Sequence, residues 1–236
     1  MYDQPAAILF DLDGTLLDND MNVFLPYYFG KLTGRASELI QPDKFMDCLM
    51  EATKAMLAND GQATNEEVFA RVFYPLVGAA REVLEPVLQA FYAVDFPILQ
   101  QYTRPKPEAP GVVQQAFDLG CDVVVATNPL FPATAVEQRM RWAGVADFPY
   151  ALVTSYENCR AAKPSLLYFK QILDAISCSA SEALVVGDED MDMVAARLGC
   201  RTFLVPGPRT SLAPTTPKPD YRGSLADVCA LLESWR

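Results

Sequence analysis

Histidine is absent from the 236-residue sequence. This absence excludes Ser-His-Asp and Cys-His catalysis, histidine general bases and every histidine-ligated metal site. Any chemistry must therefore use carboxylates, lysine, serine or threonine, cysteine, or backbone amides.

Positive charge is also scarce, with 19 Lys and Arg against 30 Asp and Glu and a net charge of −11. Such a surface argues against nucleic acid as a partner, because a phosphate backbone requires a basic surface. A small phosphorylated molecule remains possible where a local cation offsets the field. There is no basic N-terminal region and no long apolar run, so we expect no signal peptide, no contact with membranes and a cytoplasmic protein.

Paired cysteine motifs are missing as well. The six cysteines are scattered and none forms a Cys-x-x-Cys pair. Three disulfides are one reading, but a chain of this length can bury a sizeable core without them. We expect reduced, buried thiols.

Apolar runs alternate with helical stretches along most of the chain. Residues 6–12 form a short apolar run that turns acidic at its end, as in a buried strand with a functional tip. Similar runs occupy 121–127, 183–187 and 201–205, with a weaker one at 150–154. Helices are expected over 110–120, 191–199 and 224–234, and a loop over 206–219. This order predicts an α/β fold with a doubly wound parallel sheet.

Residues 19–104 differ from the rest, with Phe, Tyr, Leu and Met at helical spacing and a capping box at Thr64-x-x-Glu67. We expect an all-helical cap domain over 19–104, inserted after the first strand. The catalytic core domain would then comprise 1–18 and 105–236, with the proline-rich 104–110 as a stiff return linker. The prolines at 42, 75, 86 and 97 are expected to start or break helices.

The first chemical motif is Asp11-Leu12-Asp13-Gly14-Thr15. In a continuing strand Asp11 and Asp13 point to one side, so their carboxylates should converge at its end. Gly14 allows unusual backbone angles there. Paired carboxylates suit a Mg²⁺ site or a nucleophile beside a general acid. An Asx-turn with solvated acids is the plain alternative.

Two weaker motifs follow other strands. Thr127 and Asn128 offer a hydroxyl and backbone amides to the oxygens of a phosphate, although Thr-Asn-Pro is also an ordinary turn. Lys163 follows the candidate strand at 150–154 and could place an ammonium at the sheet edge. A single lysine is more commonly a solvated surface residue.

The last motif, Gly187-Asp188-Glu189-Asp190-Met191-Asp192, has four acids in five positions after an apolar strand. Acids near a helix start gain about 0.3–1 kcal/mol each from the helix dipole. A bound divalent cation explains this density of like charge better.

The four motifs lie at the carboxyl ends of predicted strands, where open α/β sheets place their sites. Their order and residues resemble the haloacid dehalogenase (HAD) superfamily, and the helical insert resembles its C1 cap. The resemblance implies a Rossmann-like core and Mg²⁺-dependent phosphoryl transfer through an aspartyl-phosphate on Asp11.

The resemblance also implies a role for each matching residue. Asp11 would be the nucleophile and Asp13 the general acid and base. Thr127 and the amide of Asn128 would hold the phosphoryl group, and Lys163 would neutralise its charge. Mg²⁺ would bind Asp188, the Asp11 carboxylate and the Asp13 backbone carbonyl. Asp192 would orient Lys163 or a metal-bound water, and it is the second choice after Asp188 as a metal residue of this motif. Glu189 and Asp190 remain spare acids.

An acid at position 13 separates this sequence from the namesake dehalogenases, which resemble it except at that position. We therefore expect a phosphatase acting on a small phosphorylated metabolite. A phosphomutase similar to β-phosphoglucomutase stays open, as does a non-enzymatic phosphate-binding or phospho-acceptor protein. The cap cations, which are candidates for a second substrate anion, are Arg35, Lys44, Lys54, Arg71 and Arg81. The protein is expected to be a monomer or a homodimer.

Overall fold

A six-stranded sheet forms the centre of the computed structural model, which describes residues 4–208 and 210–236. The strand order is β5-β4-β1-β6-β7-β8, and every neighbouring pair is parallel. The strands are β1 (Ala7–Phe10), β4 (Asp122–Val125), β5 (Leu152–Val153), β6 (Ala183–Gly187), β7 (Arg201–Leu204) and β8 (Tyr221–Arg222). Each predicted apolar run contains one strand, so the predicted parallel sheet is confirmed.

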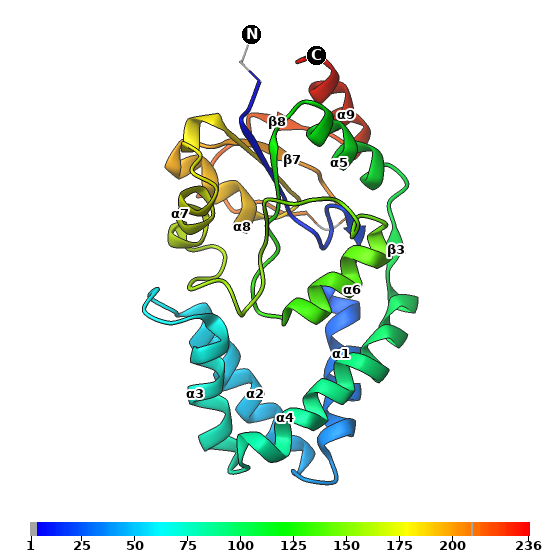
Figure 1. Ribbon diagram of the computed structural model, residues 1–236, viewed down its shortest axis with the longest axis vertical. Coiled ribbons are helices and arrows are strands. Elements are labelled where there is room, and N and C mark those ends of the chain that lie inside the picture. The colour runs from blue at the N-terminus through cyan, green and yellow to red at the C-terminus, as the bar shows by residue number, and fades with distance from the viewer. Residues whose placement is uncertain (1–3, 209) are drawn as a thin grey trace.

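Both faces of this sheet are buried. In β1, Ile8 and Phe10 face one apolar cluster, whereas Ala7 and Leu9 face another, and all four side chains are fully buried. The first cluster includes side chains from α5 (Ala109–Asp118), α6 (Ala133–Ala143) and α9 (Leu225–Glu233), and the second those from α7 (Leu166–Ala175). Figure 1 shows helices on both sides of the sheet, which confirms the doubly wound fold.

The segment between the first two long strands is helical, as predicted, and lies below the sheet in Figure 1. It comprises α1 (Met21–Ala36), α2 (Pro42–Leu57), α3 (Asn65–Val77), α4 (Arg81–Ala90), the π-helical η1 (Phe91–Asp95) and the 3-10 helical η2 (Phe96–Tyr102). The capping box at Thr64 and Glu67 is present at the start of α3. We propose that residues 19–104 act as a cap domain.

A small antiparallel pair of strands joins the helical segment to the rest of the chain. β2 (Leu17–Asp18) pairs with β3 (Arg104–Pro105), so Leu17 lies opposite Pro105. Residues 104–105, expected to be part of a linker, therefore form a strand. This pairing holds together the two points at which the chain enters and leaves the helical segment.

Two of the four singled-out prolines neither start nor break a helix. Pro42 begins α2 and Pro97 lies at the start of η2, as predicted. Pro75 and Pro86 instead lie inside α3 and α4. Both are exposed, so water can bond the carbonyl that each leaves without a helical partner.

The C-terminal part also follows the expected order with three differences. The helix predicted over 191–199 is a short α8 (Asp190–Met193) continued by the 3-10 helical η4 (Val194–Leu198). A further 3-10 turn, η3 (Ala180–Glu182), precedes β6. The described part of 206–219 is loop, as predicted, and β8 after it was not expected.

All six cysteines are free thiols, as predicted, but only four of them are buried, since Cys178 and Cys229 are partly exposed. Across residues 4–208 and 210–236, no helix has the length and apolar character that crossing a bilayer demands.

Candidate active site

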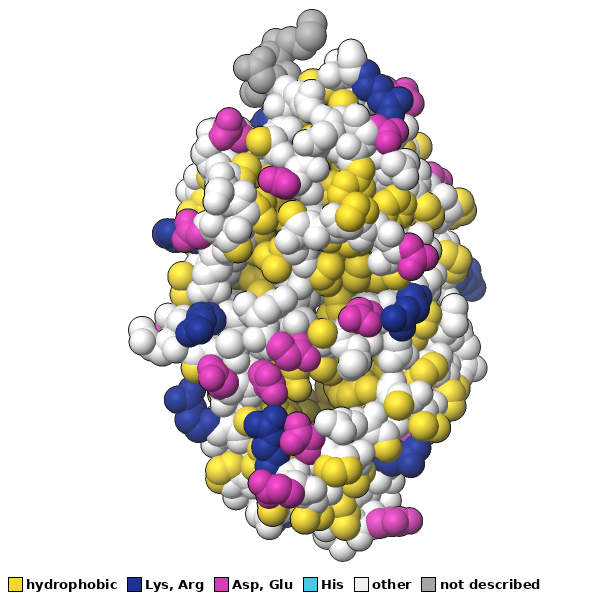
Figure 2. Space-filling model, viewed as in Figure 1, with side chains coloured by type: hydrophobic (Ala, Val, Ile, Leu, Met, Phe, Trp, Pro, Cys, Tyr) yellow, Lys and Arg dark blue, Asp and Glu magenta, His cyan; other side chains and the backbone are white. Residues whose placement is uncertain are grey.

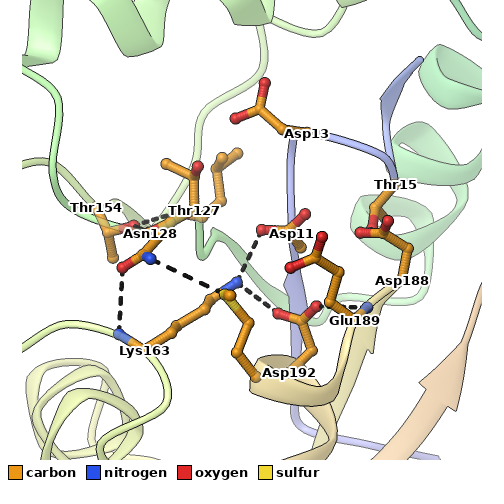
Figure 3. A network of polar contacts seen from close by, with 12 residues as sticks. Asp11, Asp13, Thr15, Thr127, Asn128, Thr154, Lys163, Asp188, Glu189 and Asp192 are labelled. Atoms are coloured by element: carbon orange, nitrogen blue, oxygen red, sulfur yellow. Dashed lines mark hydrogen bonds and ion pairs between the residues drawn. The ribbon is translucent and has the colours of Figure 1, made fainter. Parts of the chain in front are cut away.

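The four motifs meet at the carboxyl edge of the sheet. Asp11 follows β1, Thr127 follows β4, Lys163 lies in the loop beyond β5, and Asp188 follows β6. Because β1 lies between β4 and β6, three of these segments are direct neighbours. Figure 3 shows their side chains gathered in one place, as the strand-end argument predicts.

Lys163 is held between two carboxylates. Its Nζ donates to Asp11 Oδ1 at 2.7 Å and to Asp192 Oδ1 at 2.5 Å. All three residues are buried. Burial alone would lower the pKa of Lys163, but these two carboxylates raise it well above its ordinary value. Lys163 is therefore a fixed ammonium beside Asp11.

Three carboxylates lie close together at this site. Asp11, Asp188 and Asp192 each have an oxygen within 4.8 Å of the others. Burial, together with the negative charges of Asp11 and Asp192, raises the pKa of Asp188 to about 8. Lys163 alone cannot offset three negative charges, whereas Lys163 together with a divalent cation can. Carboxylate oxygens are also the ligands that Mg²⁺ prefers, so the residues fit this ion.

The carboxylate of Asp13 lies apart from this cluster. Asp13 forms a salt bridge with Arg139 of α6, and its Oδ1 accepts a hydrogen bond from Asn19 Nδ2 at 2.6 Å. Figure 3 shows the Asp13 carboxylate pointing away from Asp11. The predicted convergence of the two carboxylates is therefore wrong, because β1 ends at Phe10 and the chain turns before Asp13. Burial raises the pKa of Asp13, although Arg139 opposes the shift.

Thr127 and Asn128 border the same site. The Thr127 carbonyl accepts hydrogen bonds from Thr154 Oγ1 at 2.7 Å and from the Tyr168 hydroxyl at 2.9 Å. The side-chain oxygen of Asn128 accepts from the Lys163 backbone N–H at 3.2 Å. These bonds fix the turn after β4 against the loop that carries Lys163.

Gly14 makes room for Asp188. Its φ is +88°, and a Cβ placed there would lie 2.2 Å from Asp188 Oδ2. The carbonyl of Gly14 accepts a hydrogen bond from Lys106, while Thr15 Oγ1 donates to Asp188 Oδ1 at 3.2 Å. A side chain at position 14 would therefore displace the carboxylate that Thr15 holds.

The two spare acids of the last motif differ. Glu189 caps α8 and its side chain is exposed. Asp190 accepts from the Ala213 backbone N–H at 3.1 Å and from Thr216 Oγ1 at 2.6 Å. Asp190 therefore anchors the loop before β8 and is outside the three-carboxylate cluster.

The family model described as haloacid dehalogenase-like hydrolase matches residues 5–199. The chain belongs to this family. It is thus an enzyme of the HAD hydrolase type, and its parallel sheet is the Rossmann-like core of that family.

Curated relatives of this HAD chain are phosphatases. The phosphoglycolate phosphatase of Xanthomonas campestris pv. campestris (strain 8004) is 27% identical over 194 residues, which are 82% of this chain and 79% of the relative. The phosphoglycolate phosphatase of Aquifex aeolicus (strain VF5) is 27% identical over 200 residues, covering 84% and 83%.

Solved structures share the HAD fold at lower identity. CbbY from Rhodobacter sphaeroides in complex with phosphate superposes with a TM-score of 0.60 at 19% identity, covering 95% of this chain and 96% of that one. The L-2-haloacid dehalogenase from Xanthobacter autotrophicus with bound chloropropionic acid gives 0.60 at 15%, covering 99% and 100%. At these identities the likeness shows the fold alone.

Three residues around the HAD motifs were not found from the sequence. Arg139, Asn19 and Lys106 contact Asp13 or Gly14, yet each comes from a segment without a motif. Arg139 is fully buried in α6. An arginine at a core-facing position of a helix was the available signal, because a buried guanidinium requires a partner.

Proposed function

We propose that this HAD hydrolase is a Mg²⁺-dependent phosphomonoesterase that acts through an aspartyl-phosphate on Asp11. The observation that carries the proposal is the contact of Lys163 Nζ with Asp11 Oδ1 at 2.7 Å, inside the cluster of three carboxylates. A carboxylate fixed beside an ammonium and a divalent cation can approach a phosphate dianion without prohibitive repulsion.

The first step forms a bond between an Asp11 carboxylate oxygen and phosphorus as the ester P–O bond breaks. Asp13 gives its proton to the departing alkoxide, which leaves as an alcohol. Burial raises the pKa of Asp13, and this favours a carboxyl group that holds a proton to give. Lys163 stays on the Asp11 side and offsets charge on the phosphoryl oxygens.

The second step hydrolyses the aspartyl-phosphate. Asp13, now ionised, takes a proton from water as the water oxygen attacks phosphorus, and the bond to Asp11 breaks. Thr127 and the Asn128 backbone amide would hold the phosphoryl oxygens in both steps. Mg²⁺ would be held by Asp11, Asp188, Asp192 and the Asp13 backbone carbonyl, where it would supply positive charge.

We propose that the partner is a small phosphorylated metabolite and neither nucleic acid nor a membrane. A cytoplasmic location and a monomeric or homodimeric state accompany this proposal. The curated relatives support phosphatase chemistry rather than phosphoryl transfer to a second substrate position.

The test is phosphate release from an aryl phosphate with and without Mg²⁺. We expect turnover that requires Mg²⁺ and is lost in Asp11→Asn. Asp122→Asn is the matched control, because Asp122 is exposed at the opposite, amino end of β4. Loss of activity in both variants, or unchanged activity in Asp11→Asn, contradicts the proposal. A mutase would instead need its own sugar phosphate and return an isomer.

A further inference from the structure

One cavity joins the candidate active site to the helical segment. Its volume is about 780 Å³, and Asp11, Asp13, Thr127 and Asn128 line one end of it. The other end lies among the helices of residues 21–95. A volume in this range accommodates a molecule well beyond the size of a phosphate group. This cavity therefore offers space for the alcohol part of a phosphate ester whose phosphorus faces Asp11.

Aromatic side chains form the wall next to the catalytic end. The Phe131 ring lies 4.5 Å from the guanidinium carbon of Arg139 and 5.2 Å from the ring centre of Tyr28. The hydroxyls of Tyr28 and Tyr92 bond each other at 2.8 Å. The tyrosines thus satisfy each other's polar atoms and offer mainly ring surface to a ligand.

Apolar side chains continue the wall into the helical segment. Leu25, Phe29, Phe69 and Leu88, from helices α1, α3 and α4, are half-buried there. Figure 2 shows the hollow between the two parts of the molecule with a hydrophobic floor and acidic side chains beside it. Half-buried apolar surface around a cavity is surface that a bound apolar group would remove from water.

The lining cation next to Asp13 already has a carboxylate partner. Arg139 is fully buried and forms a salt bridge with Asp13. A substrate carboxylate at Arg139 would compete with Asp13 for this guanidinium, of which Nη2 has no hydrogen-bond partner among the described residues.

The other cations on the cavity wall are paired as well. Among the described lining residues these are Arg81, bonded to Glu66 at 3.2 Å and Glu85 at 2.9 Å, and Arg141, bonded to Glu137 at 3.3 Å. Of the cap cations considered from the sequence, only Arg81 lines this cavity in the described chain. Each cation on this wall therefore already has a carboxylate partner, with which a second substrate anion would have to compete.

We propose that the substrate is a phosphate monoester of a bulky apolar alcohol, aromatic in character, with no second anionic group. This inference rests on the proposed phosphatase function and names the substrate class of that site. It also separates this chain from its phosphoglycolate phosphatase relatives. The alcohol part of phosphoglycolate has only two carbons and ends in a carboxylate, so it would leave most of the cavity unfilled.

The first test compares kcat/KM for benzyl phosphate, ethyl phosphate and phosphoglycolate. Benzyl and ethyl phosphate have leaving alkoxides of similar basicity. The difference between their kcat/KM values therefore measures the contribution of the cavity. We expect benzyl phosphate to exceed ethyl phosphate by about 10- to 100-fold, the factor that burying a Phe-sized group supplies. Phosphoglycolate should do no better than ethyl phosphate. A preference for phosphoglycolate, or equal values for all three, overturns the substrate class and leaves the phosphatase function intact.

Two variants of one helix localise the effect. Leu88→Gln should reduce the ratio of benzyl to ethyl phosphate several-fold. Val83→Gln is the control, because Val83 is exposed on the same helix α4 and does not line the cavity. If Leu88→Gln does not fold, Ala70→Phe narrows the same cavity from α3. An unchanged ratio in a folded cavity variant overturns the proposal.

A binding measurement is independent of turnover. Calorimetry with Mg²⁺ should show benzylphosphonate binding about 10- to 100-fold more tightly than methylphosphonate. Equal affinities would count against the substrate class even if no ester were hydrolysed. Tight binding of benzylphosphonate without hydrolysis of any ester would support the cavity and refute the phosphatase function.

Discussion

The guanidinium of Arg139 forms a salt bridge with the carboxylate of Asp13, although 126 positions separate the two residues in the sequence. Arg139 is fully buried in α6, and Asp13 is also held by Asn19. The Asp13 carboxylate points away from Asp11. The salt bridge with Arg139 therefore fixes the position of the proposed general acid. Arg139 is therefore a positioning residue for Asp13.

Replacing Arg139 should harm esters with poor leaving groups most. In Arg139→Met we expect kcat for an alkyl phosphate to fall by about 100- to 1,000-fold, since general acid catalysis contributes on that order. An activated aryl phosphate should lose about tenfold or less, because its leaving group needs little protonation. Parallel kcat measurements on the two esters check this.

Arg139→Lys is the control for that substitution, because it keeps the positive charge and should recover part of the alkyl phosphate activity. Breaking a buried ion pair costs about 3–5 kcal/mol, so folding of Arg139→Met must be verified by circular dichroism. Equal losses for both esters in a folded variant would show a purely structural role.

Two acids of one motif should behave differently. Asp192 contacts Lys163, whereas Asp190 bonds Ala213 and Thr216 in the loop before β8. Asp192→Asn should lower kcat by about 100-fold or more, because Lys163 loses a charged partner and its orientation. Asp190→Asn should keep most activity and lose about 0.5–1.5 kcal/mol of unfolding free energy. A larger activity loss in Asp190→Asn than in Asp192→Asn contradicts the assignment.

Substitution of Gly14 tests the carboxylate cluster, because a side chain there would clash with the Asp188 carboxylate. Gly14→Ala would place a Cβ 2.2 Å from Asp188 Oδ2, whereas a Cβ at Gly120 meets no atom within 4 Å. Both glycines have positive φ, so both substitutions carry a strain of about 1–2 kcal/mol. We expect Mg²⁺ to raise the Tm of wild type and of Gly120→Ala, but not of Gly14→Ala. The same Mg²⁺-dependent rise in all three proteins would place the cation elsewhere.

Cys159 should contribute to stability in a way that alkaline pH removes. Burial raises the pKa of its thiol from 9.0 to about 12. The folded state therefore keeps the proton longer than the unfolded state, so the contribution is complete below pH 9. It is lost between pH 9 and 12, at up to about 1.4 kcal/mol per pH unit.

Denaturant titrations at several pH values check this. The unfolding free energy of Cys159→Ala should fall less steeply above pH 9 than that of wild type, while both should change in parallel between pH 7 and 8. Identical slopes above pH 9 would mean that the thiol ionises equally in both states.

The sheet could be predicted because its strands are buried on both faces. Runs such as 183–187 are apolar at every position, and a parallel sheet explains this pattern. β2, β3 and β8 have two residues each, too short for any periodicity. They form because neighbouring strands present free backbone groups.

The motif residues could also be predicted, because strand ends bring Asp11, Thr127 and Asp188 to one edge by topology alone. The direction of the Asp13 carboxylate could not, because it depends on the turn after Phe10 and on Arg139 from a distant helix. A core-facing arginine in a helix signals that a buried partner exists, but the sequence does not identify Asp13 as that partner.

The most direct measurement is to quench the enzyme in acid during turnover of an aryl phosphate with Mg²⁺ and to map phosphorylated peptides by mass spectrometry. The account predicts a phosphoryl group on Asp11 that is absent in Asp11→Asn, which should also release no phosphate. A phosphoryl group on another residue, or phosphate release by Asp11→Asn at the wild-type rate, would contradict the proposed mechanism.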